Sequence, residues 1–336
     1  MPRTGKVDRS FFERHIAPRL GADRTDVSVG PKHGVDFGVV DAGGRAVVTA
    51  TDPLSVLPEL GFERAGRFAV GIVLADVAVS GVRPTHLTVS FSLPPEMTDA
   101  EFATLWEAIH RECRALGVAV VTGHTARYAG CSFPWVGAAT AIAVGDPDDI
   151  VRPDGARPGD DLLVTNGPAV EAVGLLSTLF PDAVPGKVRE TAQRRLDDVG
   201  AVRDALAAAE AGRVTAMHDA TEGGLLGALH EVAEGAGVRL VVESDSVPVL
   251  PAVLDTADAL GMDPWRATTS GTLVIAVDPG DTDAVVGALE RRQTAVEIVG
   301  RVERGTGVVL DGEASEPPSA DSSWEVYERL LEDAET

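Results

Sequence analysis

VDFGVVDAGGRAVVTATD, residues 35–52, is the stretch from which the fold of this chain is inferred. Its two β-rich runs flank Ala42-Gly43-Gly44, and a three-residue loop with glycine at the left-handed position predicts a β-hairpin. In that register Asp36 and Asp52 share one face of the hairpin as diagonal neighbours, about 7 to 8 Å apart by strand geometry. A two-residue loop would place them on opposite faces. Two carboxylates on one face favour a magnesium-type metal site, and the alternative is a pair of solvated acids at strand ends.

A third acid, Asp76, interrupts the apolar segment 68–80. Burying a carboxylate costs several kcal/mol unless a cation or hydrogen-bond donors offset the cost, so this residue is also predicted to bind metal. Arg67 and Arg83 bracket only 15 residues, which is short of the roughly 20 that a bilayer requires. The segment is therefore predicted to be a core helix rather than a membrane span.

The chain carries a formal net charge of −23 over 336 residues, and 44% of its residues are hydrophobic. These values fit two globular domains and argue against nucleic acids or anionic membranes as partners, because both repel an acidic surface. Only three of the 29 basic residues are lysines, and an acidic, lysine-poor surface suggests a halophilic protein in a high-salt cytosol. Neither cysteine has a metal-binding spacing and no signal peptide is recognised, so a reducing cytoplasm is the expected location.

Strands and helices alternate in two blocks, which predicts an α/β domain followed by an α+β domain. The Pro-, Gly- and Asp-rich run 145–161 reads as the linker between them. The predicted parts are a domain at 1–150, a domain at 151–312, and a tail with a helix at 313–336. Helices are predicted at 98–116, 168–180, 188–211, from 223 onward and at 324–331, and strands at 85–93, 118–123, 136–144, 162–165, 213–217, 238–243, 271–277 and 296–302.

Two glycine turns in the second block each connect a strand to a helix. The free N–H groups and the positive end of a helix make such turns suitable for phosphate, although a tight connection also needs glycine for geometry alone. His218 and Asp219 precede the second turn and supply a candidate base and acid for phosphoryl chemistry. Neither turn has the P-loop pattern. The predicted nucleotide-binding residues of these turns are Asn166, Gly167, Thr221, Gly223 and Gly224.

The ordered motifs GPKHGVDFGVV, TDPLSV, ADVAVSGVRP, VTGHT, TNGPAVEAVG and MHDATEGGL resemble the superfamily of aminoimidazole ribonucleotide (AIR) synthetase over roughly residues 5 to 310. That superfamily includes thiamine-monophosphate kinase, selenophosphate synthetase and the hydrogenase maturation proteins that make a thiocyanate group. The likeness is greatest to the maturation proteins and their archaeal AIR synthase-related relatives. It implies a PurM-like N-terminal domain whose strands join those of a second copy in a dimer barrel, a PurM-like C-terminal domain, and bound ATP with Mg²⁺.

The resemblance also suggests roles for individual residues. Asp36, Asp52 and Asp76 match the family's metal-binding acids, and the loop 30–34 matches the segment that closes over the phosphates of ATP. Further residues matched to the nucleotide site are Gly30, Lys32, Gly34, Gly123 and Thr125.

Two departures from the family pattern bear on activity. His124 stands in place of a metal-binding carboxylate. It is expected to bind the metal, to donate a hydrogen bond to a phosphate or to act as a base; the alternative is a structural histidine that only fills space at the edge of the core. The chain ends at Thr336 where the maturation proteins carry a terminal cysteine, so thiocarbamate chemistry on its own tail is not expected. The resemblance implies activation of an oxygen of an unidentified acceptor by phosphoryl transfer. One alternative is a small-molecule kinase. The other is a nucleotide-binding maturation or regulatory protein without catalysis. His124 favours this second alternative, and so does Ser270, because the maturation proteins have an acid at the position of Ser270.

Overall fold

The computed structural model describes residues 5–7 and 9–334, so the chain end at Thr336 lies outside the described residues. The chain forms two compact units. The first-half unit comprises Thr25–Gly30 and Asp36–Ile150, and the second-half unit comprises residues 151–334. The second-half unit also includes 5–7, 9–24 and Pro31–Val35, so two early segments fold with the later part of the chain.

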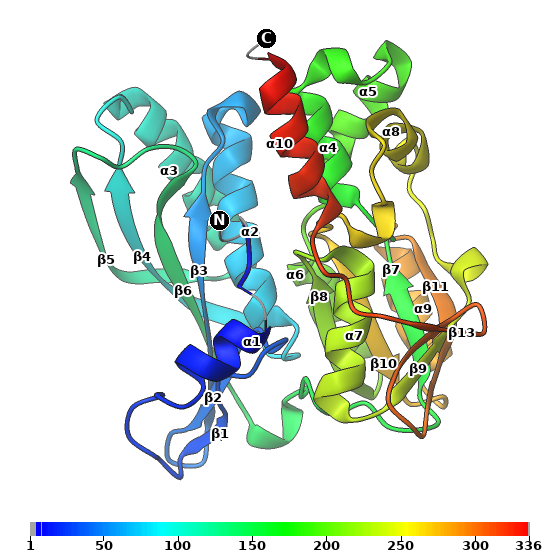
Figure 1. Cartoon of the computed structure of the whole chain (residues 1–336). Helices are drawn as coiled ribbons and strands as arrows, with labels where there is room; N and C mark the ends of the chain where they lie inside the picture. The colour runs from blue at the N-terminus through cyan, green and yellow to red at the C-terminus, as the bar shows by residue number, and fades with distance from the viewer. Residues whose placement is uncertain (1–4, 8, 335–336) are drawn as a thin grey trace. The chain divides into compact units, whose positions relative to one another are not determined.

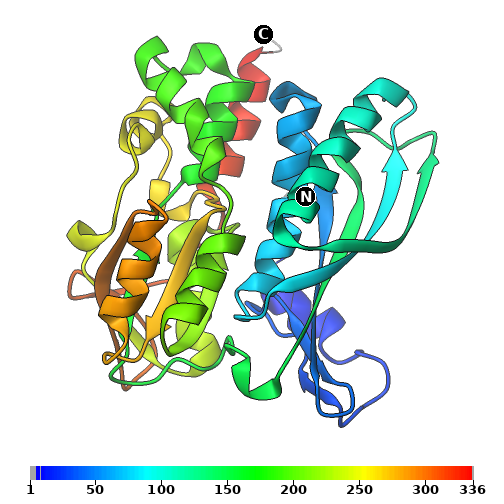
Figure 2. The same ribbon diagram turned by 180° about the vertical axis from the view of Figure 1, so that it is seen from behind.

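The first-half unit is a six-stranded sheet covered on one face by two helices, α2 (Phe62–Ala78) and α3 (Asp99–Leu116) (Figures 1 and 2). Neighbouring strands are antiparallel except β4 and β5, which are parallel because α3 connects them. In sheet order the strands are β1 (Val27–Val29), β2 (Gly38–Asp41), β3 (Ala46–Ser55), β6 (Trp135–Gly145), β4 (Pro84–Leu93) and β5 (Ala119–Arg127).

The hairpin of β2 and β3 confirms the predicted strands but not the predicted loop. Ala42 N–H donates to the Arg45 carbonyl at 2.8 Å, so Gly43 and Gly44 alone form the loop. Both glycines have positive φ, +67° and +84°, as a two-residue type I′ turn requires. The three-residue loop was therefore wrong by one residue, and the shared face derived from it for Asp36 and Asp52 does not follow. Regular pairing of β2 begins only at Gly38.

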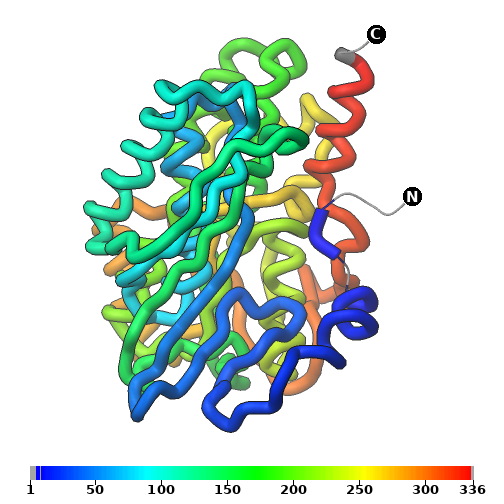
Figure 3. Tube along the Cα trace, turned by 90° about the vertical axis from the view of Figure 1, so that its left-hand side faces the viewer, coloured from blue at the N-terminus to red at the C-terminus, as the bar shows by residue number. Residues whose placement is uncertain are grey.

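The face of this sheet away from its helices is only partly buried, and β5 forms the sheet edge (Figures 1 and 3). Val121 on β5 is 54% exposed and Trp135 on β6 is 52% exposed. Large apolar side chains that are this exposed on a sheet with an open edge are typical of a surface that another chain covers.

We predict that a second copy of this chain covers this surface, giving a homodimer. Light scattering in molar KCl at micromolar concentration is expected to give twice the chain mass, and Val121→Glu is expected to shift the protein toward monomer. Thr104→Glu, on an exposed position of α3, is the matched control. A strictly monomeric wild type would contradict the prediction.

The second-half unit is a seven-stranded sheet with α7 (Gly224–Ala236) on one face and α6 (Val202–Ala211) and α9 (Thr282–Arg291) on the other (Figures 1 and 2). The face toward α7 is apolar because alternate residues of the central strands are Ala, Val and Leu. In sheet order the strands are β13 (Glu313–Ser315), β12 (Gly307–Leu310), β9 (Arg239–Val242), β11 (Val296–Glu303), β7 (Asp161–Thr165), β10 (Thr272–Val277) and β8 (Val214–Ala220).

The helices α4 (Val170–Leu179), α5 (Gly186–Gln193), α8 (Val253–Leu260) and α10 (Ser322–Ala334) share a second apolar cluster, which includes Val173, Leu260 and Val326. The short helix α1 (Arg9–Phe11) buries none of its residues. The single helix predicted at 188–211 is wrong, since a 3₁₀ turn at Arg194–Asp197 and an irregular stretch at 198–201 interrupt it. The helices α8 and α9 carried no recognised signal.

Within the described residues, we find no helix whose length and apolar content suffice to cross a bilayer.

Candidate functional site

Strand β8 carries His218 and Asp219 at its carboxyl end, and both residues are 3% exposed. His218 lies on the face of the sheet that packs against α7, because it alternates with Ala216 and Ala220 of the apolar cluster there. Its Nδ1 lies 4.0 Å from an Asp219 carboxylate oxygen. The predicted base and acid are thus neighbours on a rigid strand.

His218 contacts Glu231, a residue that sequence reasoning did not find. His218 Nε2 lies 2.8 Å from Glu231 Oε2 on α7. Burial alone would raise the pKa of Glu231, but the hydrogen bond and charge of His218, with the charges of Lys6 and His33, outweigh it and lower the pKa to about 2. Glu231 is therefore a carboxylate throughout the neutral range.

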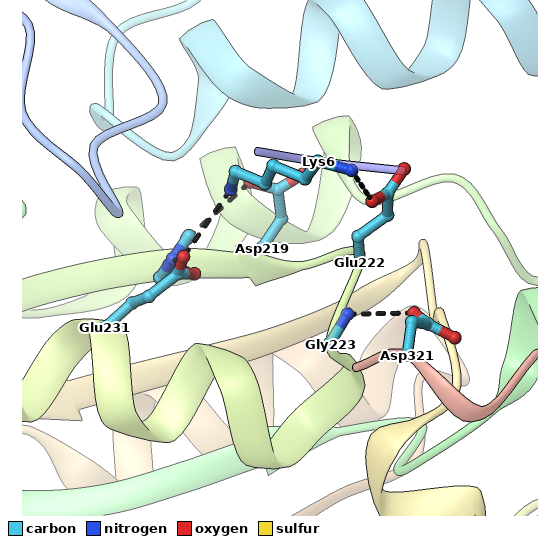
Figure 4. Close-up of polar contacts among 7 residues, drawn as sticks. Lys6, Asp219, Glu222, Gly223, Glu231 and Asp321 are labelled. Atoms are coloured by element: carbon cyan, nitrogen blue, oxygen red, sulfur yellow. Dashed lines mark hydrogen bonds and ion pairs between the residues drawn. The ribbon is translucent and has the colours of Figure 1, made fainter. Parts of the chain in front are cut away.

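Lys6, from the N-terminal segment, lies between two acids of this site (Figure 4). Its backbone N–H donates to Glu222 at 2.5 Å, and its ammonium lies 3.5 Å from Glu231 Oε1. Gly34 approaches the same acid, since a Cβ at this position would lie 2.8 Å from Glu231 Cγ. Burial lowers the pKa of the adjacent His33, against the opposing charge of Glu231. Two early segments of the chain therefore enclose the Glu231 side chain.

The turn that starts α7 already holds an anion from its own chain (Figure 4). Gly223 N–H donates to Asp321 at 2.8 Å, and Gly224 N–H donates to the Thr221 carbonyl at 3.0 Å. Asp321 is buried, and its other oxygen accepts from Ser323. A carboxylate at this helix start follows the preference of such ends for anions. Phosphate binding by Thr221, Gly223 and Gly224 stays a prediction, and it requires phosphate to replace Asp321 at Gly223.

The other glycine turn uses its polar groups internally. Asn166 Nδ2 donates to the Gly271 carbonyl at 2.9 Å, and the Gly167 carbonyl accepts from two threonine hydroxyls. The first amide of α4, that of Val170, donates to Thr269 Oγ1 at 3.0 Å. These contacts favour a structural role for the turn, and nucleotide binding by Asn166 and Gly167 stays a prediction.

Ser270, at which the maturation proteins have an acid, donates hydrogen bonds to a carboxylate from another element, that of Glu171. Its hydroxyl donates to Glu171 Oε2 on α4 at 2.5 Å, and its backbone N–H donates to the same oxygen at 3.2 Å. Burial raises the pKa of Glu171, and the bonds from Ser270 only partly oppose this. A carboxyl group therefore lies beside position 270 although the residue there is serine.

In the first-half unit, Asp76 confirms the predicted buried acid on a core helix. It is 7% exposed and lies in the last turn of α2, where the negative end of the helix dipole disfavours a carboxylate. Burial and helix position both oppose this charge, so a cation would relieve both costs. Asp52 lies in β3 opposite Ala139, and Asp36 precedes β2; both are half-buried. The three acids suit a hard divalent cation chemically, and their joint ligation stays a prediction.

The remaining predicted nucleotide residues lie in both units. Gly30 follows β1 in the first-half unit, whereas Lys32 and Gly34 belong to the second-half unit, where Lys32 is exposed. Gly123 and Thr125 lie on β5, paired with Val89 and Phe91 of β4.

His124 also lies on β5, which continues to Arg127 rather than ending at the VTGHT motif. The side chain is exposed, and its Nε2 lies 3.2 Å from the Tyr128 hydroxyl. An exposed histidine on an edge strand packs no core, so the space-filling alternative loses support.

We therefore predict that His124→Ala keeps the fold and thermal stability of wild type but loses nucleotide affinity or turnover. We also predict that His124→Asp binds Mg-ATP at least as tightly as wild type, because a carboxylate suits magnesium better than imidazole does. Calorimetry with Mg-ATP and a phosphate-release assay measure both. Wild-type behaviour of His124→Ala in both assays would remove the residue from the site.

Family models match most of the chain. The model described as AIR synthase related protein, N-terminal domain, matches residues 34–144, and the model of the C-terminal domain matches residues 157–313. Carbamoyl dehydratase HypE of Cupriavidus necator is 29% identical over 273 residues, covering 80% of this chain and 74% of that protein. Thiamine-monophosphate kinase of Halobacterium salinarum is 31% identical over 278 residues, covering 77% of this chain and 83% of that protein.

Solved structures share the two-domain fold and confirm the predicted fold class. The hydrogenase maturation protein HypE in complex with ATP has a TM-score of 0.68 at 22% identity, covering 94% of this chain and 93% of that chain. AaThiL complexed with AMPPCP and TMP has a TM-score of 0.70 at 21% identity, covering 86% of this chain and 90% of that chain.

Proposed function

Because this chain belongs to the AIR synthase related protein family, we propose that it is an ATP- and magnesium-dependent enzyme that activates an oxygen of an acceptor by phosphoryl transfer. The observation that carries the proposal is the 2.8 Å contact between His218 and Glu231, with His218 and Asp219 both buried on β8 directly before the turn that starts α7. Phosphoryl transfer uses a base, an acid and backbone N–H groups that bind an anion. The Gly223 N–H at the start of α7 already binds the carboxylate of Asp321. The HypE structure with ATP supports the choice of nucleotide.

Each group has a proposed role. Asp36, Asp52 and Asp76 would hold magnesium, which neutralises phosphate charge when bound. The loop 30–34, with Lys32, would contact the phosphates of ATP. His218 accepts the proton of the acceptor, and the amide of Gly223 binds an anionic group in place of Asp321.

The name carbamoyl dehydratase suggests one acceptor class, a carboxamide. Phosphorylating an amide oxygen converts it into a leaving group, after which loss of phosphate completes a dehydration.

The experiment is to incubate the protein with Mg-ATP in molar KCl, with and without carboxamide acceptors, and to measure ADP and phosphate together. Equal release of ADP and phosphate that depends on the acceptor supports the proposal. ATP binding without turnover, across a broad acceptor set, would favour a nucleotide-binding maturation or regulatory role instead.

The second candidate is a small-molecule kinase, which the likeness to thiamine-monophosphate kinase of Halobacterium salinarum favours. In this case the phosphoryl group stays on the product. Thiamine monophosphate as the acceptor, with the product identified by mass spectrometry, separates the two: ADP and a doubly phosphorylated product without free phosphate indicate the kinase.

A further inference from the structure

We propose that Glu231 is a positioning residue that holds His218 in the Nε2–H tautomer, so that Nδ1 accepts a hydrogen from the substrate. The inference rests on the proposed function and assigns to it a residue outside the sequence motifs. Its basis is the 2.8 Å contact between His218 Nε2 and Glu231 Oε2.

On the side that faces α7, His218 lies among apolar side chains. Ala216, Ala220, Leu225 and Leu229 form the layer between β8 and α7 in which His218 lies. Taking an imidazole and a carboxylate out of water is costly, and apolar residues of similar size would serve packing as well or better. Stability alone therefore does not explain a buried histidine paired with a half-buried glutamate, whereas fixing the orientation of an imidazole does.

The carboxylate of Glu231 is held in place from outside the helix. Gly34 leaves no room beside its Cβ and Cγ, because a Cβ at Gly34 would lie 2.9 and 2.8 Å from them. Lys6 stands 3.5 Å from Oε1, which leaves Oε2 directed to His218. A carboxylate constrained on both sides can fix the tautomer and the ring orientation of the imidazole, as in other carboxylate–histidine pairs.

The tautomer follows from hydrogen-bond chemistry. An ionised carboxylate only accepts, so the hydrogen of this contact is on Nε2, and in neutral imidazole the other nitrogen is then an acceptor. That nitrogen, Nδ1, is 4.0 Å from an Asp219 oxygen. During transfer the acceptor O–H or N–H hydrogen passes to Nδ1, the acceptor oxygen bonds to the γ-phosphorus, and the bond from that phosphorus to ADP breaks.

The test compares Glu231→Ala and Glu231→Gln with the matched control Glu234→Gln, an acid three residues on along α7 that pairs with Arg9. Nitrogen-15 NMR of histidine-labelled protein reports the tautomer, and the spectrum of His218→Asn assigns the His218 signal among the seven histidines. Wild type and Glu234→Gln are expected to show the Nε2–H form. Glu231→Ala is expected to lose this preference, and its kcat to fall about 10- to 100-fold while the KM for ATP stays within about twofold. Glu231→Gln, whose amide oxygen still accepts, is expected to recover part of the activity.

An unchanged His218 tautomer in Glu231→Ala, or an unchanged kcat in a folded Glu231→Ala, would overturn the proposal. The NMR measurement needs no substrate. A wild type with the Nε2–H tautomer but no ATP turnover would therefore contradict the proposed function while leaving the His218–Glu231 contact established. A wild type with the Nδ1–H tautomer would contradict the contact itself.

Discussion

Replacing His218 with asparagine is expected to lower acceptor-dependent ATP turnover by about 100- to 10,000-fold, the range that loss of a general base produces. Asparagine still donates a hydrogen to Glu231, so this carboxylate keeps a partner, but asparagine takes no proton from the acceptor. ADP release at saturating acceptor measures the effect. The affinity for Mg-ATP is expected to stay within about threefold, because the change leaves the proposed metal ligands intact.

The control for this variant is His230→Asn. His230 lies on α7, directly before Glu231. His230 is half-buried, and its Nε2 lies 3.5 Å from the Ser315 hydroxyl rather than near Asp219 or Glu231. It is expected to retain wild-type turnover. Full activity of a folded His218→Asn would exclude His218 as the base.

Asp76→Asn is expected to weaken ATP binding in the presence of magnesium by about 10- to 100-fold while leaving binding in EDTA unchanged. Loss of one group that supports a bound metal lowers affinity by about 10- to 100-fold. Asparagine is isosteric, and it removes a buried negative charge from the carboxyl end of α2, so the fold is expected to survive without loss of stability. Calorimetry on folded protein measures the two affinities.

Asp52→Asn is expected to behave in the same way. Asp41→Asn is the matched control, since Asp41 lies in the same hairpin and its carboxylate accepts from Gly44 N–H, a role that asparagine also fills. Wild-type magnesium dependence in both Asp52→Asn and Asp76→Asn would refute the metal assignment.

The helix predicted at 98–116 shows where sequence reasoning is reliable. The structure gives α3 as Asp99–Leu116, with a capping box between Thr98 and Glu101 and Gly117 in the left-handed conformation at its end. Each signal acts within one turn of the helix, so the residues that encode it are adjacent in the chain.

The hairpin shows where local reasoning fails. Ala42-Gly43-Gly44 is compatible with loops of two or three residues, and the two differ by one position in register. The choice follows from the pairing of β3 with β6 and of β2 with β3 over many residues. For this reason the relation between Asp36 and Asp52 could not be derived from the loop sequence.

The sequence by itself determined the alternation of strands and helices in two blocks, the burial of Asp76, and the position of His218 and Asp219 before a glycine turn. These features depend on periodicity and on neighbouring residues. Only the tertiary structure identified the partners: Glu231 for His218, Lys6 for Glu222, Glu171 for Ser270, and Asp321 for Gly223. The last three partners lie 216, 99 and 98 positions away in the chain. Contacts over such distances arise from how whole elements pack, and no spacing within a motif records them.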